Sequence, residues 1–192
     1  MYIHADPDSL FDERLVRLLM RLLKPRIKGN ICISKFVYEN LKSDAEKKII
    51  YNGTNISLGD RLKKRNDIIH LVYVGRIVED KGIQNIIELL VEVQLPFSMT
   101  IVGDGNYKST LEKMVVQNGL SSSISFVGES ADVSKWLESA DLFVHPAICK
   151  EGFGITLIEA MACGVPCIAY KRGAIGEIIT DNIDGFLVAE FS

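Results

Sequence analysis

From residue 68 onward, short apolar runs alternate with segments in which apolar residues recur at every third or fourth position. The runs are rich in Val, Ile and Leu and end near glycine or proline, which is typical of buried strands. The segments between them have the periodicity of amphipathic helices. We therefore expect strands at 68–75, 97–102, 123–128, 141–146, 166–170 and 185–189. We expect helices at 82–93, 107–120, 131–140 and 154–164, and a helical turn at 175–180.

This alternation predicts an α/β fold with a Rossmann-like parallel sheet and helices on both faces. Strands that are apolar at nearly every position favour a parallel sheet, because such strands are buried on both sides. In sheets of this kind, ligands bind beyond the carboxyl ends of the strands. The turns after Val74, Val102, Val127 and Val144 therefore form the expected wall of a site.

The first 66 residues follow a different pattern. Residues 12–24 have strong helical character, 29–34 resemble a strand before a helix capped by Ser34, and 46–54 resemble a strand that ends in an Asn-Gly turn. This stretch is too short to be a whole domain, so we expect part of a second α/β unit. The expected division is a first unit, a polar linker and a main domain at 1–53, 54–66 and 67–192.

Composition and charge restrict the classes of function. The 192 residues are 47% hydrophobic and 24% charged, with a net charge of −3, as in ordinary soluble globular proteins. This balance carries no signature of nucleic-acid binding. We see neither an apolar run of membrane-spanning length nor a secretory leader pattern, and we expect a cytoplasmic protein. The cysteines match no disulfide or zinc pattern and are expected to be reduced, buried thiols: Cys32, Cys149, Cys163 and Cys167.

Two glutamates surround a glycine pair at 151–159. Gly152 and Gly154 allow a sharp turn and close approach to a ligand, and the helix after them offers free amide hydrogens to an anion such as a diphosphate. Glu151 before the turn and Glu159 one helical turn into the helix would then bind hydroxyls on either side, of a sugar and of a ribose. Taken alone, the glutamates favour a simpler interpretation, in which one complements the helix dipole and the other is solvated.

Two basic residues follow the first strand of the main domain. Arg76 lies just past the strand end and Lys81 five residues later, so both reach the same edge of the sheet. A planar guanidinium and a compact ammonium are suited to neutralising a departing diphosphate. Taken alone, Arg76 and Lys81 favour a simpler interpretation as surface residues beside Glu79 and Asp80. The chain has no complete Gly-x-Gly-x-x-Gly motif after a strand, which argues against nicotinamide binding.

Several motifs in order now identify a resemblance: "GRIVEDKG", "IVGDG", "ISFVGE", "EGFGITLIEAMACGVPCIA" and "GEIITDNIDGFLV". The region from Leu71 to Val188 resembles the donor-binding, C-terminal domain of retaining, two-domain GT-B glycosyltransferases of the family-4 type. Earlier, "ICISKF" and "IIYNGT" resemble the end of that family's N-terminal domain. The resemblance implies that 1–53 is a remnant of the acceptor-side domain and that 67–192 is the donor domain, truncated at its C-terminus.

The resemblance also implies roles for individual residues. Arg76 and Lys81 would hold the diphosphate and stabilise the leaving group, and Glu151 would bind the transferred sugar. Glu159 would bind the ribose, and the backbone at Val127 would meet the base. His4 matches a histidine near the reacting sugar, although an ordinary turn histidine fits it equally well. The loop and helix start complete the expected donor site: Gly152, Phe153, Gly154, Ile155 and Thr156.

The expected function is hexosyl transfer, with retention and without a metal or other cofactor, from a UDP-, GDP- or ADP-linked sugar to a glycan or lipid-linked acceptor. The isolated chain is expected to have little or no activity, because it carries mainly the donor half. Two alternatives stay open: a non-catalytic nucleotide-sugar binding module that needs a partner, and an epimerase or phosphorylase of the same architecture. Two residues depart from the family pattern, Ala147 in place of serine and Ala174 in place of glycine. Either replacement could narrow the donor or acceptor pocket, and neither removes a charged group.

The helix expected at 13–24 carries a basic stripe beside a leucine-rich face. A solvated helix packed on its own sheet is the simplest interpretation. A peripheral contact with the inner face of a membrane is an alternative, because basic amphipathic helices bind anionic lipid surfaces. A homodimer through the N-terminal remnant is a further alternative.

Overall fold

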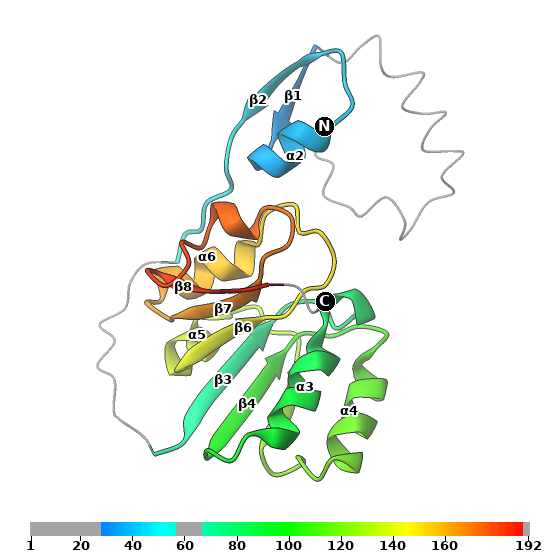
Figure 1. The fold of residues 1–192 in the computed structure, drawn as a ribbon, viewed down its shortest axis with the longest axis vertical. Helices are drawn as coiled ribbons and strands as arrows, with labels where there is room; N and C mark the ends of the chain where they lie inside the picture. The colour runs from blue at the N-terminus through cyan, green and yellow to red at the C-terminus, as the bar shows by residue number, and fades with distance from the viewer. Residues whose placement is uncertain (1–27, 57–66, 190–192) are drawn as a thin grey trace. The chain divides into compact units, whose positions relative to one another are not determined.

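A computed structural model describes residues 28–56 and 67–189 (Figure 1). These residues belong to two compact units, which divide between Asn52 and Gly53. The expected linker at 54–66 lies almost entirely outside the described residues. The helix expected at 13–24 and His4 lie outside them as well.

The first unit contains a parallel pair of short strands, β1 (Gly29–Cys32) and β2 (Glu46–Ile49). Between them runs α2 (Lys35–Asn40), which begins after Ser34. The Ser34 hydroxyl accepts a hydrogen bond from the Val37 amide at 3.0 Å, and this confirms the cap expected from the sequence. An N-terminal serine of this kind stabilises a helix by about 1 kcal/mol.

The second strand of this unit is shorter than expected. β2 ends at Ile49, and no turn forms at Asn52-Gly53, so the prediction of a strand over 46–54 with an Asn-Gly turn is wrong. The physical reason lies in β1, which stops where Ser34 starts the helix. The Ile50 amide donates to the Cys32 carbonyl at 2.9 Å, and beyond this bond β1 offers no further backbone partner.

The second unit contains a six-stranded parallel sheet, with strand order β5-β4-β3-β6-β7-β8. Parallel pairing links all neighbouring strands. Each strand coincides with an apolar run of the sequence: β4 has the expected bounds, and the other five strands are one or two residues shorter. The bounds are β3 Ile69–Val74, β4 Phe97–Val102, β5 Ile124–Gly128, β6 Leu142–His145, β7 Cys167–Tyr170 and β8 Gly185–Val188.

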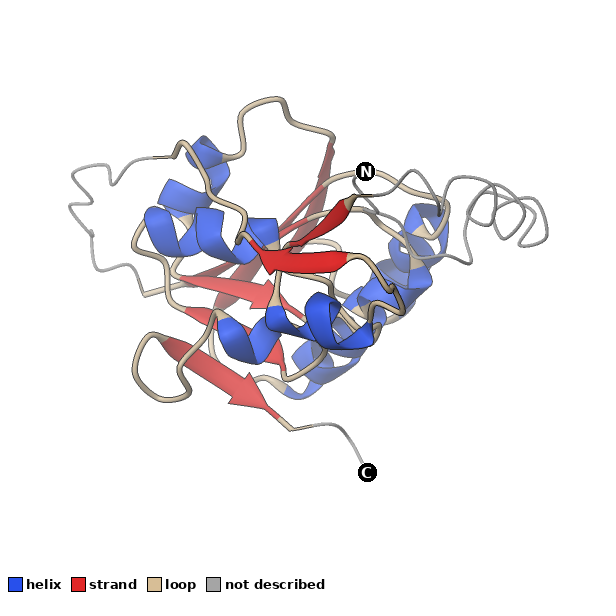
Figure 2. Cartoon of the chain, turned by 90° about the horizontal axis from the view of Figure 1, so that it is seen from above, coloured by secondary structure: helices blue, strands red, loops and turns tan. Residues whose placement is uncertain are grey.

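Helices cover the sheet from both sides (Figure 2). One apolar core joins the sheet to α3 (Ile83–Glu92) and α4 (Lys108–Gln117). The other joins it to α5 (Ser134–Ser139) and α6 (Ile155–Ala162). Alternate residues of β3 serve the two cores, because Leu71 and Tyr73 enter the first and Val72 and Val74 enter the second. The Rossmann-like α/β fold expected from the sequence is thus confirmed.

The connections between strands place a topological switch point in the middle of the sheet. From β3 the chain proceeds outward to β4 and β5, and it then returns to form β6 on the other side of β3. The loops after β3 and β6 consequently leave the same edge in opposite directions. Ligands bind in the crevice that such a reversal creates, and the short 3-10 helix η2 (Glu79–Lys81) lies in the connection from β3 to α3.

Glycines at this edge allow backbones to touch. Gly103 follows β4 with φ +137°, and a Cβ atom there would collide with the Gly75 carbonyl oxygen after β3. The Gly103 amide donates to the Gly128 carbonyl at 2.7 Å, and the Gly75 amide donates to the Val102 carbonyl at 3.0 Å. These contacts fix the ends of β3, β4 and β5 to one another.

We expect Gly103→Ala to lower the free energy of unfolding by at least about 2 kcal/mol, because the added methyl group meets backbone atoms that cannot move independently. Gly119→Ala is the matched control. Gly119 also has a positive φ, +71°, but open space surrounds the position of its missing Cβ, so only the backbone strain of about 1 kcal/mol remains. Urea unfolding of both variants measures the difference, and equal losses would contradict the steric explanation.

Candidate ligand-binding site

The loops after β3 and β6 are joined through their backbones. The amides of Ile148 and Cys149 both donate to the Asp80 carbonyl, at 3.0 and 3.2 Å. Gly82, with φ +69°, lies so close to the Pro146 carbonyl oxygen that a Cβ atom would collide with it. The two connections therefore form one rigid wall at the switch point of the sheet.

An ion pair lies across this wall. The Lys81 ammonium of η2 contacts Oε1 of Glu151 in the loop after β6, and the two side chains are only 16% and 15% exposed. The Glu151 backbone is also fixed, because its carbonyl accepts a hydrogen bond from the Ala174 amide at 2.8 Å. The structure thus brings together two of the residues that the sequence analysis selected, although they are far apart in the chain.

Two further side chains adjoin the ion pair. His145, the last residue of β6, places Nε2 3.5 Å from Glu151 Oε1. Cys149 places its sulfur 4.0 Å from both the Lys81 ammonium and the Glu151 carboxylate. The described cysteines are all free, and three of the four are buried as expected, whereas Cys149 is only partly buried.

The surroundings shift the pKa values of this cluster. Burial acts to raise the pKa of Glu151, but the adjacent His145 ring, whose Nε2 lies 3.5 Å from Oε1, and the positive charge of Lys81 together outweigh it and lower the pKa to about 2. Burial raises the pKa of the Cys149 thiol to about 11, so the thiol is protonated at neutral pH. Burial, together with the negative charge of Glu151, also raises the pKa of Tyr73. The Glu151 carboxyl group is consequently ionised at neutral pH.

The glycine-containing loop leads directly from Glu151 into α6. Gly154, with φ +116°, precedes the helix, and no side chain caps its first turn. Phe153 is buried and anchors the loop. The first amides of α6, at Ile155 and Thr156, have no acceptor within the helix. The helix start therefore offers donors and the positive end of a dipole beside the ion pair.

The other expected site residues have different surroundings. Glu159 is partly buried on α6, burial raises the pKa of its carboxyl group, and it has no side-chain partner among the described residues. Arg76 is exposed immediately after β3, and Val127 on β5 is 37% exposed. Among the described residues, no hydrogen bond or ion pair joins the side chains of these three residues to Glu151. Their roles stay predictions.

Sequence reasoning missed His145, Cys149 and Tyr73 as members of this cluster. A signal existed for His145, because a histidine that ends an apolar strand at the switch point of a sheet is placed to face a ligand. Cys149 and Tyr73 gave no such signal, because a thiol and a tyrosine in apolar surroundings are common core residues.

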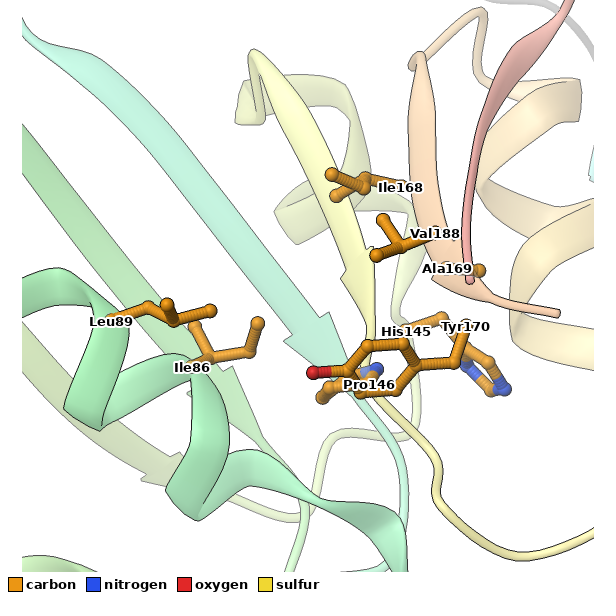
Figure 3. A pocket seen from close by; sticks show the side chains of 8 residues that line it. All are labelled: Ile86, Leu89, His145, Pro146, Ile168, Ala169, Tyr170 and Val188. Atoms are coloured by element: carbon orange, nitrogen blue, oxygen red, sulfur yellow. The ribbon is translucent and has the colours of Figure 1, made fainter. Parts of the chain in front are cut away.

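An apolar pocket of about 80 Å³ lies on the α3 side of the sheet (Figure 3). Its lining contains no Asp, Glu, Lys or Arg, so it does not suit a diphosphate. His145 is its link to the ionic cluster. The lining residues are Ile86, Leu89, His145, Pro146, Ile168, Ala169, Tyr170 and Val188.

Within residues 28–56 and 67–189, we find no group of three or more His, Cys, Asp or Glu side chains placed to hold a metal ion. In the same part of the chain, no helix combines the length and the apolar character needed to cross a membrane.

Comparison with known proteins gives consistent results. Residues 59–192 match the model of a family described as glycosyl transferases group 1. An uncharacterized glycosyltransferase of Methanocaldococcus jannaschii is 34% identical over 163 residues, which are 82% of this chain and 44% of the relative. An alpha-monoglucosyldiacylglycerol synthase of Acholeplasma laidlawii is 29% identical over 79% of this chain and 44% of its own length. The chain thus spans about half the length of these relatives.

Solved structures share the fold at lower identity. HepE of Anabaena, solved with UDP and glucose, has a TM-score of 0.80 at 24% identity, over 93% of this chain and 54% of that one. A sucrose-phosphate synthase from Thermosynechococcus elongatus has a TM-score of 0.81 at 24% identity, over 97% of this chain and 51% of its own. At this identity the likeness establishes the fold.

The low pKa of Glu151 predicts an acid-sensitive contribution to stability. A carboxyl group whose pKa falls from 4.5 to about 2 on folding stabilises the fold above about pH 4.5, and this contribution, up to about 3 kcal/mol, is lost as the pH falls toward 2. The free energy of unfolding of the wild type should therefore approach that of Glu151→Gln between these pH values. Glu112→Gln, at an exposed position of α4, is the control. A constant gap between wild type and Glu151→Gln over this range would contradict the assignment.

Proposed function

Because the chain belongs to the glycosyl transferases group 1 family and has the fold of GT-B glycosyltransferases, we propose that residues 67–189 bind a nucleotide-sugar donor. We further propose that the whole protein transfers the sugar, with retention, to an acceptor hydroxyl. The observation that carries the proposal is the partly buried Lys81–Glu151 ion pair at the switch point, beside the start of α6.

A buried ion pair is weak support for stability, because two desolvated charges gain little over apolar side chains of similar size. Such a pair is more readily explained as two groups kept ready for a charged, hydroxyl-rich ligand. Lys81 supplies a compact cation for a phosphate, and Glu151 supplies two acceptor oxygens for sugar hydroxyls. A nucleotide sugar that binds between Lys81 and Glu151 would give each of them a new partner, a phosphate for Lys81 and sugar hydroxyls for Glu151.

Sugar transfer leaves a nucleoside diphosphate that carries added negative charge. In the proposed complex, Lys81 and Arg76 neutralise this charge, and the amides at Gly154, Ile155 and Thr156 bind the phosphate oxygens at the helix start. Arg76 is free to do so, because its side chain is exposed and has no ion-pair partner among the described residues. Glu159 would accept hydrogen bonds from the ribose, and the backbone at Val127 would contact the base.

This arrangement would bind the diphosphate without a metal ion. Lys81, Arg76 and the helix start supply the positive charge that a divalent cation supplies elsewhere. UDP is the first nucleotide to test, because the Anabaena relative was solved with UDP and glucose.

We expect calorimetry to detect binding of UDP, GDP or ADP that persists in EDTA. Arg76→Ala should weaken it about tenfold or more, because a hydrogen-bonded charge contact contributes about 1.5–3 kcal/mol. Lys113→Ala, at an exposed position of α4, should leave the affinity unchanged. Failure of all three nucleotides to bind would refute the proposed function, and loss of binding in EDTA would refute its metal independence.

The two glutamates should differ in what they recognise. Glu159→Ala should weaken binding of the plain nucleoside diphosphate about tenfold or more, through lost hydrogen bonds to the ribose. Glu151→Ala should spare the nucleoside diphosphate and weaken only the sugar-bearing donor. Calorimetry with UDP and UDP-glucose separates the two effects, and Glu112→Ala is the control for loss of an exposed glutamate. Equal effects of both changes on UDP would contradict these roles.

A further inference from the structure

His145 is a buried polar side chain without a settled partner. It is only 6% exposed, and neither ring nitrogen makes a hydrogen bond within the described part of the chain. Its ring stacks on Phe143 with centroids 6.4 Å apart and planes inclined by 25°. Burying a polar group without a hydrogen bond is energetically unfavourable. A buried histidine without partners therefore suggests that its hydrogen bond forms in another state of the protein, such as a ligand complex.

The nearest acceptor is the Glu151 carboxylate. The separation of 3.5 Å between His145 Nε2 and Glu151 Oε1 is at the long limit of a hydrogen bond. The Lys81 ammonium contacts the same oxygen. A small rotation of the carboxylate toward β6 would close the gap to His145, and departure of the ammonium would remove what opposes that rotation.

Donor binding would change the partners of this carboxylate. Lys81 is a flexible point charge, and in the proposed function its ammonium turns to a phosphate oxygen. Glu151, 15% exposed, would then lose its cation, and a desolvated carboxylate without a partner is strongly unfavourable. The sugar hydroxyls that Glu151 would bind are neutral donors, and their hydrogen bonds are weaker than those from a charged ammonium.

The other groups near Glu151 cannot replace Lys81. The Cys149 thiol lies 4.0 Å away and is a weak donor. The Tyr73 hydroxyl already donates to the Arg76 carbonyl at 2.8 Å. The Asp80 side chain carries no positive charge that could replace that of Lys81. His145, with two unpaired nitrogens, is the donor that faces it.

We propose that His145 is a positioning residue for Glu151, whose carboxylate it holds by a hydrogen bond when the Lys81 ammonium turns to the diphosphate of the donor. The inference rests on the proposed function. The bond requires a proton on Nε2, and the ring stacks on Phe143. Glu151 thereby remains ionised and correctly oriented for the sugar hydroxyls.

The first test needs no ligand. In Lys81→Gln, which imitates the departure of the ammonium, NMR titration of the Glu151 carboxyl carbon should give a pKa still below the usual value of about 4.3. Adding His145→Phe, which keeps ring packing but has no donor, should raise that pKa above about 4.3. Adding His145→Gln instead, which restores an N–H donor, should keep it lower than in the Phe variant.

His70→Gln is the matched control. His70 bonds to Thr100 at 2.9 Å from the other end of the sheet, so its loss should not change the Glu151 titration. His145→Leu repeats the test if the Phe variant fails to fold. An identical Glu151 pKa with and without the His145 ring, in the Lys81→Gln background, would overturn the proposal.

The second test measures recognition. In the otherwise wild-type chain, His145→Phe should weaken UDP-glucose binding about tenfold and leave UDP within about twofold, whereas His145→Gln should retain most of the affinity. An equal loss for UDP and UDP-glucose would overturn the positioning role. If the wild type binds no nucleoside diphosphate, the proposed function fails, and the carboxyl titration still decides whether His145 holds Glu151.

Discussion

Direct pairing of β3 with β6 is the constraint on which the site depends. Leu71 lies opposite Leu142 and Val72 opposite Phe143, so two strands separated by about seventy residues end at one edge of the sheet. The loops that follow these strands must then start from adjacent points of that edge before they lead in opposite directions. The hydrogen bonds to the Asp80 carbonyl fix the loops at a distance that Lys81 and Glu151 can bridge. Without this register, the same residues would be unrelated surface charges.

The chemistry of the site follows from burial as much as from charge. In water, an exposed lysine and glutamate contribute little to one another. Here both are largely removed from solvent, so each needs a partner continuously. In the proposed complex, the partners available to Glu151 are Lys81, His145 and the donor, and the carboxylate exchanges one of them for another. In this proposal, the exchange of partners at the Glu151 carboxylate distinguishes the cluster from an ion pair that only stabilises the fold.

The strands of the sheet could be predicted because each is a continuous apolar run, and the fold class followed from their alternation with helices. Arg76, Lys81 and Glu151 could be assigned to one edge because each follows a strand end. Their contacts could not, because they depend on loop paths that no local pattern encodes. The length of β2 depended on where its partner β1 stops, which is likewise not a local property. His145 was passed over although it ends an apolar strand at the switch point, and its proximity to Glu151 depends on the path of the loop after β6.

The glycine contacts at the sheet edge have a consequence for how ligand preference can change over generations. Gly82, Gly103 and Gly105 each lie against a carbonyl group that leaves no space for a Cβ atom. This part of the rim is therefore made of main chain, and single amino-acid replacements cannot reshape it without loss of the fold. New preferences must arise where side chains have room to change, as at the exposed Arg76 after β3 and the partly exposed Val127 on β5. Mutational change is thus directed to exposed side chains near the ends of β3 and β5, while the main-chain part of the rim stays chemically constant.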